Sequence, residues 1–191
     1  MDLALTTERL LLTPFSDAEI NMAIDMFTDP EVLRYAGGAM SEDDIRGQMN
    51  NWTRRGGNGC VGIWCIKDRE TAERFGSVAL LPMPIESKDT DYTLVEPDTW
   101  PDNDIEVGYF LRRSAWGNGY ATEGCRRIVR FAFQESPLAE IVATFDTGNA
   151  ASRRVLEKSG FVNHGTRRCY GEDGVDYRIS RDDWLRSRMS R

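Results

Sequence analysis

A short glycine turn, Gly117-Asn118-Gly119, separates two segments of different periodicity, and it constrains the fold more than any other feature of the chain. Residues 104–111 before the turn are rich in apolar and aromatic residues and predict a strand. Residues 121–134 after it carry an apolar stripe at helical spacing, and residues 140–145 predict a second strand. Strand, helix and strand in this order predict a βαβ unit, because parallel neighbours need a long crossover connection.

Further strands and helices are expected on either side of this unit. Ser16 and Ser41 precede acidic residues, as is typical of helix N-termini, so we expect helices from there to about residue 28 and to just before Gly56. Segments 9–13, 59–67, 74–81, 161–170 and 175–180 predict strands, and 150–159 predicts a helix. The Asp173-Gly174 signal places the last hairpin loop at residues 171–174. We therefore expect an α/β fold, a mixed sheet with helices on both faces, in one domain of residues 1–191.

The composition argues against several classes of protein. Hydrophobic residues make up 40% of the chain and charged residues 29%, as in an ordinary soluble domain, and no apolar run approaches the roughly 20 residues that span a bilayer. The acidic N-terminus lacks the features of a secretory signal, so we expect a cytoplasmic protein. A net charge of -7 argues against a nucleic-acid partner. Four cysteines without a CxxC pair and one histidine give little material for a metal site, so no metal is expected.

The glycine turn also predicts chemistry. Glycines let backbone N–H groups approach a phosphate closely, and the N-terminus of the following helix adds the positive end of its dipole. The turn therefore indicates an anion site, although a short glycine turn before a helix is also an ordinary connection. It is not a P-loop, because no Gly-Lys-Ser/Thr follows, and it lacks the third glycine of the dinucleotide fingerprint.

Several segments, in this order along the chain, resemble the GNAT superfamily of N-acetyltransferases. They are residues 7–12, 29–32, 105–111, 116–123, 149–161 and 177–179 before Trp184. Within the superfamily they are most similar to the ribosomal-protein N-terminal acetyltransferase branch. The resemblance covers most of the chain. It implies a mostly antiparallel central sheet, acetyl-CoA as the co-substrate, and transfer of its acetyl group to a primary amine by direct attack in a ternary complex.

The resemblance also implies where acetyl-CoA binds. Backbone amides of the turn would cradle the pyrophosphate, and the pantetheine would lie along the edge of the preceding strand. The implied residues are Phe110, Leu111 and Arg112 on the strand, Trp116, Gly117, Asn118, Gly119, Tyr120, Ala121 and Thr122 at the turn, and Asn149, which contacts pantetheine or substrate. The Gln or Arg that is usual three positions before the first glycine is Ser114 here. Because backbone amides do most of the phosphate binding, the change is expected to be tolerated, and Arg112 and Arg113 are candidates to supply the charge.

Glu106 is the predicted general base. By period-two alternation it shares a strand face with Gly108 and Phe110, so a carboxylate stands among residues that are expected to be buried. A partly desolvated carboxylate has a raised pKa and can take the proton that an attacking ammonium must lose. The alternative is a glutamate at the exposed end of the sheet, bound to a nearby arginine. The resemblance favours the base.

The second predicted catalytic residue is Ser152, which the resemblance places near the sulfur of CoA. Asn149 fits a helix cap as well as a ligand, and Gly160 fits the left-handed residue at the other end of the same helix. Many members of the superfamily carry a tyrosine, the acid for the departing thiolate, where this chain has Leu156. Ser152, Tyr170 and water are the candidates for that acid here.

The acceptor amine is the least defined part of the site. The subfamily favours a protein N-terminal α-amine, and polyamines, amino acids and aminoglycosides are the other candidates. Tyr35 and Trp52 fit either an acceptor pocket or the core, and the loop 81–103 with Trp100 fits either a lid or a homodimer contact. His164 is given no role. Two other functions stay open: a non-catalytic CoA-binding regulatory module, and an enzyme that uses another nucleotide at the turn.

Thermal unfolding with acetyl-CoA, ATP and NAD added separately tests the glycine turn. Acetyl-CoA alone should raise the unfolding temperature, because a ligand at about 100 times its Kd adds roughly 2.7 kcal/mol to the free energy of unfolding. A folded sample that acetyl-CoA does not stabilise would show that the turn is only a connection. A shift with ATP or NAD would indicate another nucleotide.

Overall fold

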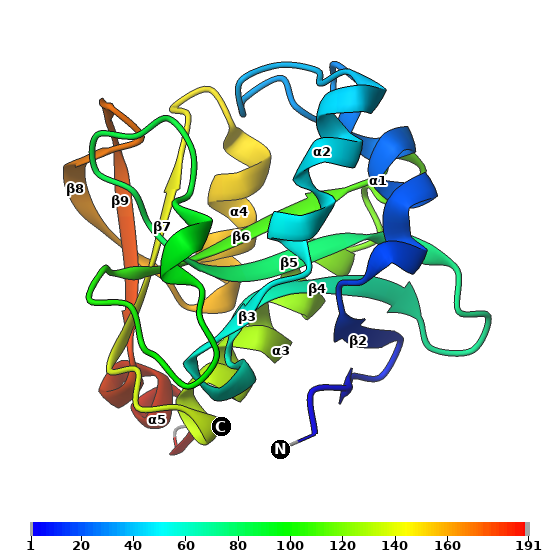
Figure 1. Cartoon of the computed structure of the whole chain (residues 1–191). Coiled ribbons are helices and arrows are strands. Elements are labelled where there is room, and N and C mark those ends of the chain that lie inside the picture. The colour runs from blue at the N-terminus through cyan, green and yellow to red at the C-terminus, as the bar shows by residue number, and fades with distance from the viewer. Residues whose placement is uncertain (1, 190–191) are drawn as a thin grey trace.

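The computed structural model describes residues 2–189, and strands that pair into one sheet form its centre (Figure 1). The strands are β1 Leu5–Thr6, β2 Leu10–Pro14, β3 Arg55–Gly56, β4 Val61–Asp68, β5 Arg74–Pro82, β6 Ile105–Leu111, β7 Glu140–Phe145, β8 Val162–Cys169 and β9 Glu172–Ser180. The α-helices are α1 Ile20–Phe27, α2 Glu42–Trp52, α3 Tyr120–Glu135, α4 Ala150–Ser159 and α5 Arg181–Met189.

The strands follow the order β1-β2-β4-β5-β6-β7-β9-β8 across the sheet, with β3 paired to β4 beside this path. Every pair of neighbours within residues 2–189 is antiparallel except β6 and β7. These two strands run parallel and are connected through α3, which confirms the predicted βαβ unit. The expected mixed, mostly antiparallel sheet is confirmed as well.

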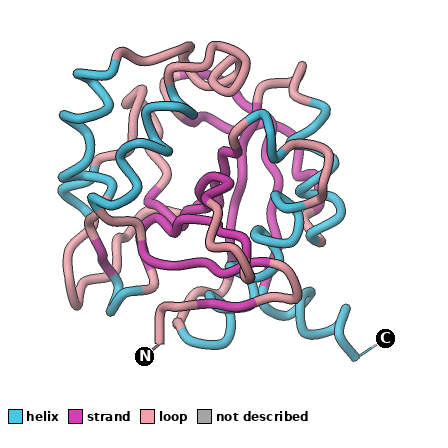
Figure 2. The backbone as a smooth tube through the Cα atoms, turned by 90° about the vertical axis from the view of Figure 1, so that its right-hand side faces the viewer, coloured by secondary structure: helices cyan, strands magenta, loops and turns pink. Residues whose placement is uncertain are grey.

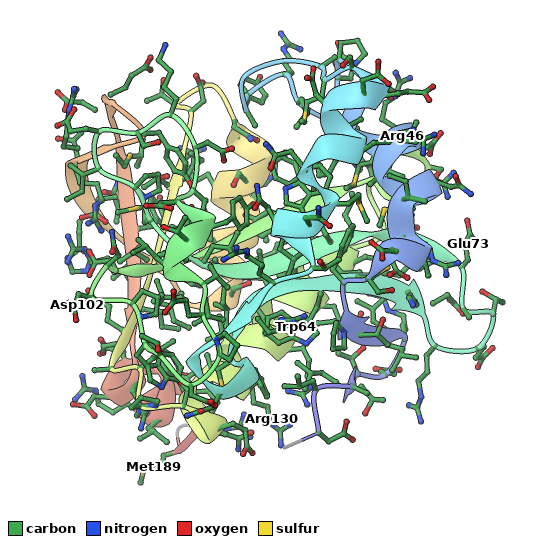
Figure 3. The ribbon with its side chains drawn as sticks, viewed as in Figure 1. Arg46, Trp64, Glu73, Asp102, Arg130 and Met189 are labelled. Carbon is green, nitrogen blue, oxygen red and sulfur yellow. The ribbon has the colours of Figure 1, made fainter. Side chains whose placement is uncertain are left out.

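Helices cover both faces of the sheet (Figures 1 and 2). α1 and α2 lie on one face, where Phe27 of α1 packs against Phe110 of β6 with ring centroids 5.4 Å apart. α3 and α4 lie on the other face, where Phe131 of α3 meets Trp64 of β4 edge to face at 5.6 Å. Figure 3 shows Trp64 in the interior, between the strands and α3. The sheet therefore separates two apolar layers.

α3 packs through the stripe that its sequence predicts. Cys125, Ile128 and Ala132 are fully buried, whereas Arg130 on the opposite stripe is exposed (Figure 3). Burial of such a stripe against a sheet supplies most of the stability of a helix in a protein. None of the helices in residues 2–189 combines the length and the hydropathy that a membrane crossing requires.

Some short elements have no counterpart in the prediction. β1 and β3 contain two residues each, too few for an alternating pattern, and α5 buries none of its residues completely. The first helix begins with a 3₁₀ turn, Asp17–Glu19, before α1. At the end of α4, Gly160 has a φ of 96°, the left-handed conformation that the sequence predicts there.

The sequence predicts the last hairpin loop at residues 171–174, and this prediction is wrong. The loop consists of Tyr170 and Gly171, both with positive φ, and the Asp173-Gly174 dipeptide lies inside β9. Two left-handed residues match the twist of the flanking strands. The loop is fixed by tertiary hydrogen bonds, since the N–H groups of Tyr170 and Gly171 donate to the carbonyls of Pro84 and Ile85 at 3.2 and 2.8 Å. A local dipeptide signal does not contain these contacts.

Gly76 on β5 permits a close approach of β5 and β6. Its φ is 155°, and a Cβ built there would lie 2.1 Å from the carbonyl oxygen of Phe110. Gly76→Ala should therefore lower the free energy of unfolding by about 3 kcal/mol, because β6 would have to move away. Chemical denaturation measures this, with Gly108→Ala as the control, since a Cβ there would meet no atom within 4 Å. Equal stability of the two variants would contradict the prediction.

Candidate active site

β6 is bonded along its whole length on one side only. Seven residue pairs join it to β5, from Gly76↔Leu111 to Pro82↔Ile105. Within the described residues, its parallel ladder to β7 consists of one pair, Glu106↔Val142. Beyond Glu106 the two strands separate, so the C-terminal half of β6 presents an open edge toward β7. We call this space the β6–β7 gap.

The backbone groups of Tyr109 and Leu111 form the open edge of β6. The Arg112 N–H donates to the backbone of β5 at 2.9 Å, so the even-numbered residues of β6 turn their backbone groups to β5 by the alternation of an antiparallel ladder. Phe110 is among them and cannot offer its own amide to the gap. The Leu111 carbonyl accepts a hydrogen bond from the Trp116 indole at 2.8 Å. The N–H groups of Tyr109 and Leu111 point into the gap.

The glycine turn after this edge forms a row of backbone donors. Gly117 and Gly119 have φ values of 78° and 80°, the left-handed conformation that glycine adopts readily. Within residues 2–189 no N–H group from 117 to 122 has a protein acceptor, and the next donor, Glu123, bonds the Gly119 carbonyl at 3.0 Å. A Cβ at Gly117 would meet no atom within 4 Å, so the space above the turn is open. Consecutive amides at a helix N-terminus form a site for an anion.

The two arginines that the sequence suggests as a charge source are paired with carboxylates. Arg112 Nε lies 2.6 Å from Asp25 Oδ2, and Arg113 Nη1 lies 3.6 Å from Asp29 Oδ2. Ser114 is exposed and carries no charge. The positive potential of the turn therefore comes mainly from its amides and the dipole of α3. The two ion pairs tie the end of β6 to α1 and the loop after it.

Glu106 is buried, as its alternation with Phe110 predicts, with 8% of its surface exposed. The hydroxyl of Tyr170, at the tip of the β8–β9 hairpin, donates to Glu106 Oε1. Burial raises the pKa of Glu106 to about 8, and the positive charge of Arg167 opposes this only in part. Arg167 itself pairs with Asp104 at 2.6 Å. The alternative of an exposed, arginine-bound glutamate does not fit this geometry.

Asn149 and Ser152 lie at the start of α4, on the other side of β6. Asn149 Oδ1 accepts from the Ser152 N–H at 3.0 Å, which confirms the predicted helix cap. Ser152 Oγ lies 2.9 Å from the hydroxyl of Tyr109, and Tyr109 alternates with Glu106 along β6. Glu106 and Ser152 therefore approach β6 from opposite faces. Leu156 is buried in the core and brings no polar group to this place.

Aromatic residues of α2 and the loop 81–103 surround the Glu106 side of β6. Trp52 is buried and packs against Phe27 with ring centroids 5.0 Å apart, so it is a core residue. Tyr92, on the loop 81–103, packs against the same apolar cluster as Trp52. Burial raises the pKa of Tyr92, and the charges of Asp89 and Glu106 raise it further. The charge of the buried Glu106 carboxylate therefore acts on the hydroxyl of Tyr92, which lies on the loop 81–103.

The remaining aromatic candidates have separate surroundings. Tyr35 is exposed and lies beside Gly148, in the loop before α4. Trp100 packs over Gly57 and holds the loop 81–103 to the body of the protein. That the loop 81–103 acts as a lid or as a homodimer contact stays a prediction. His164 is exposed on β8.

Sequence reasoning missed Tyr109 and Tyr92. Strand alternation could have identified Tyr109, because it places this polar residue on the face opposite Glu106, where the helix with Ser152 must pack. Tyr92 lies in a loop without periodicity, so no pattern marks it. Tyr170 was a candidate acid, but its hydrogen bond to Glu106 depends on the tertiary structure. In the described part of the chain, no three His, Cys, Asp or Glu side chains gather into a metal-binding group.

Comparison with known proteins identifies the family of the chain. Residues 9–162 match the acetyltransferase (GNAT) domain family. The chain is 32% identical over 158 residues to YkkB of Bacillus subtilis, an alignment that covers 82% of this chain and 83% of that protein. It is 33% identical over 194 residues to the FsC-acetyl coenzyme A-N(2)-transacetylase of Aspergillus fumigatus, covering 95% of this chain and 78% of that protein.

Solved structures show the same fold. The aminoglycoside acetyltransferase AAC(6')-Ib in complex with coenzyme A superposes with a TM-score of 0.71 over 94% of this chain and 99% of that chain, at 17% identity. The ribosomal branch has narrower support, since YdaF of Bacillus subtilis, a relative named for ribosomal N-acetylation, is 35% identical over 63 residues, 33% of this chain and 34% of that protein. The chain therefore belongs to the GNAT acetyltransferase family and is an acetyl-CoA-dependent N-acetyltransferase.

Proposed function

We propose that this enzyme transfers the acetyl group of acetyl-CoA directly to a primary amine while both substrates are bound. The observation that carries the proposal is the placement of a buried carboxylate, Glu106, where the β6–β7 gap opens. The acceptor amine binds on the Glu106 side of β6, and the thioester lies in the gap. No covalent enzyme intermediate is needed, because the amine itself is the nucleophile.

Acetyl-CoA binds, in this proposal, along the open edge of β6 and the turn after it. The pyrophosphate accepts hydrogen bonds from the N–H groups of residues 117–122, which lack protein acceptors in the described chain. The amide groups of pantetheine pair with the edge of Tyr109 and Leu111 as a neighbouring strand would. Trp116, 47% exposed beside the turn, offers its indole face to the cofactor. The Asn149 side chain approaches pantetheine from the start of α4.

The chemical steps follow from the two faces of β6. Glu106 takes a proton from the ammonium, directly or through water, and the neutral amine attacks the acetyl carbonyl carbon. Negative charge develops on the carbonyl oxygen, and this oxygen accepts a hydrogen bond from the N–H of Tyr109 or Leu111. The carbon–sulfur bond then breaks and CoA leaves as a thiolate. The attacking nitrogen loses its second proton in this step, and the thiolate takes up a proton through Ser152 Oγ, 2.9 Å from the Tyr109 hydroxyl, or through water, so that the amide and the free CoA thiol are the products.

The acceptor that we propose is a protein N-terminal α-amine, with a small-molecule amine as the alternative. The subfamily resemblance supports the α-amine, while the names of two relatives point to an N(2) amine and to aminoglycosides as acceptors of those proteins. A panel of peptides with free N-termini, polyamines, amino acids and aminoglycosides, assayed by release of the CoA thiol, separates these classes. Tight CoA binding without thiol release over the whole panel would favour the non-catalytic module.

Replacing Glu106 by Gln should lower kcat about a hundredfold or more, because the amine would lose its proton acceptor. The Kd for CoA should change by less than about twofold, since the turn and the edge of β6 are untouched. Steady-state kinetics and calorimetric titration measure the two quantities. Glu140→Gln, at the start of β7, is the control and should keep its turnover. Unchanged kcat in Glu106→Gln would remove the base assignment.

The activity should rise with pH through about 8. Glu106 acts as a base only when it is ionised, and burial raises its pKa to about 8, so kcat/KM should be low below this pH and level above it. Tyr170→Phe removes a hydrogen bond donated to the carboxylate, which destabilises the ionised form and raises the pKa further. The midpoint should therefore move to higher pH in this variant.

The pH profiles of the wild type and Tyr170→Phe are measured with one acceptor, so that ionisation of the amine is common to both. A midpoint that moves to lower pH in the variant, or a wild-type profile without any titration, would contradict the assignment of the profile to Glu106.

A further inference from the structure

One side chain from the N-terminal segment reaches the glycine turn. Arg9, between β1 and β2, donates through Nη1 to the Asn118 carbonyl at 3.0 Å, inside the turn. Its guanidinium carbon lies 4.8 Å from the ring centroid of Tyr120, the first residue of α3. The Tyr120 ring in turn stacks on Phe75 of β5 at 4.5 Å, with 7° between the ring planes. Arg9 thus contacts the turn at its middle and at its end.

Glu123, in the first turn of α3, anchors this arginine. Its Oε2 accepts from Arg9 Nε at 2.8 Å, and its Oε1 accepts from the Thr7 hydroxyl at 2.6 Å and from the Arg9 backbone N–H at 3.1 Å. Burial acts to raise the pKa of Glu123, but the hydrogen bonds from Thr7 and Arg9 outweigh it and lower the pKa. The carboxylate is therefore ionised at neutral pH, with 18% of its side chain exposed.

The hydrogen bond to Asn118 fixes the direction of a donor. A peptide unit is planar and trans, so the carbonyl of Asn118 and the N–H of Gly119 point in opposite directions. Holding the carbonyl on the Arg9 side therefore keeps the Gly119 N–H on the open side of the turn. Flanking glycines rotate easily, and without this bond the peptide unit would be free to turn its carbonyl toward the anion site.

The ion pair removes a repulsion. An unpaired Glu123 would place a negative charge within one helical turn of the amides of residues 117–122, where it would oppose a phosphate. Paired with Arg9 it is neutralised. The free amides and the dipole of α3 then set the potential of the turn.

We propose that Arg9 is a positioning residue for acetyl-CoA. It holds the Asn118 carbonyl and neutralises Glu123, so that the turn is arranged for the CoA pyrophosphate before the cofactor arrives. The inference rests on the proposed role of the turn in binding acetyl-CoA. It requires no contact between Arg9 and CoA, and it gives Arg9 a function at a turn 109 residues away in the sequence.

Calorimetric titration of CoA into matched variants tests this role. Arg9→Met should raise the Kd about tenfold, a usual coupling within one hydrogen-bond network. Arg127→Met is the control, because Arg127 also ties α3 to the N-terminal segment, through Nε to the Thr6 carbonyl at 3.0 Å, without a bond to the turn. Its Kd should stay within about twofold of the wild type. At saturating acetyl-CoA, kcat should be unchanged in both variants, a split that a general loss of stability would not produce.

The double variant Arg9→Met/Glu123→Gln distinguishes two roles of Arg9: arranging the turn and neutralising Glu123, or contacting CoA directly. Because it lacks the unpaired carboxylate, it should bind CoA more tightly than Arg9→Met alone. A double variant that binds no more tightly than Arg9→Met, or an Arg9→Met that binds like Arg127→Met, would overturn the inference. Wild-type protein that does not bind CoA would refute the proposed role of the turn instead.

Arg9→Lys keeps the test decisive if Arg9→Met does not fold. Lysine keeps the charge but lacks the planar fork that reaches Asn118 and Glu123 together. Its Kd should lie between those of the wild type and Arg9→Met or, where the latter is unfolded, clearly above that of the wild type. Wild-type affinity in Arg9→Lys would overturn the role of the hydrogen bond to Asn118.

Discussion

The asymmetric bonding of β6 is the constraint on which the rest of the site depends. In residues 2–189, seven pairs to β5 fix the strand on one side, whereas a single pair, Glu106↔Val142, joins it to β7. A strand held in this way is rigid and yet keeps unpaired backbone groups along one edge, and such an edge readily accepts another extended chain. Pantetheine, which carries amide groups, suits that edge. The glycine turn follows directly where the strand ends.

β6 also divides the proposed chemistry between its two faces. Alternation directs Glu106 toward α1 and α2, and it directs Tyr109 toward α3 and α4. Ser152, in the first turn of α4, lies beside the Tyr109 hydroxyl. Burial raises the pKa of Glu106, and the hairpin tip supplies a hydroxyl to its carboxylate through Tyr170. Proton removal from the amine and departure of CoA would thus take place on opposite sides of one strand.

Much of this architecture follows from local patterns. The apolar stripe of α3 and the strands around it predict the βαβ unit, and alternation along β6 predicts the burial of Glu106. Elements without a pattern were missed: β1 and β3 are too short to alternate, and α5 buries no residue completely. The hairpin loop was misplaced because the tertiary contacts of Tyr170 and Gly171 outweigh a strong dipeptide signal.

The sequence by itself determined the fold class, the position of the glycine turn and the strand face that carries Glu106, because helical and strand periodicities and glycine conformations are local properties. Only the tertiary structure decided which charges and hydroxyls meet. Arg112 and Arg113 form ion pairs with Asp25 and Asp29, which no local pattern predicts. Contacts such as Tyr170 with Glu106, and Arg9 with Asn118 and Glu123, join residues far apart in the chain, and no local periodicity records which distant side chains the packing of the sheet brings together.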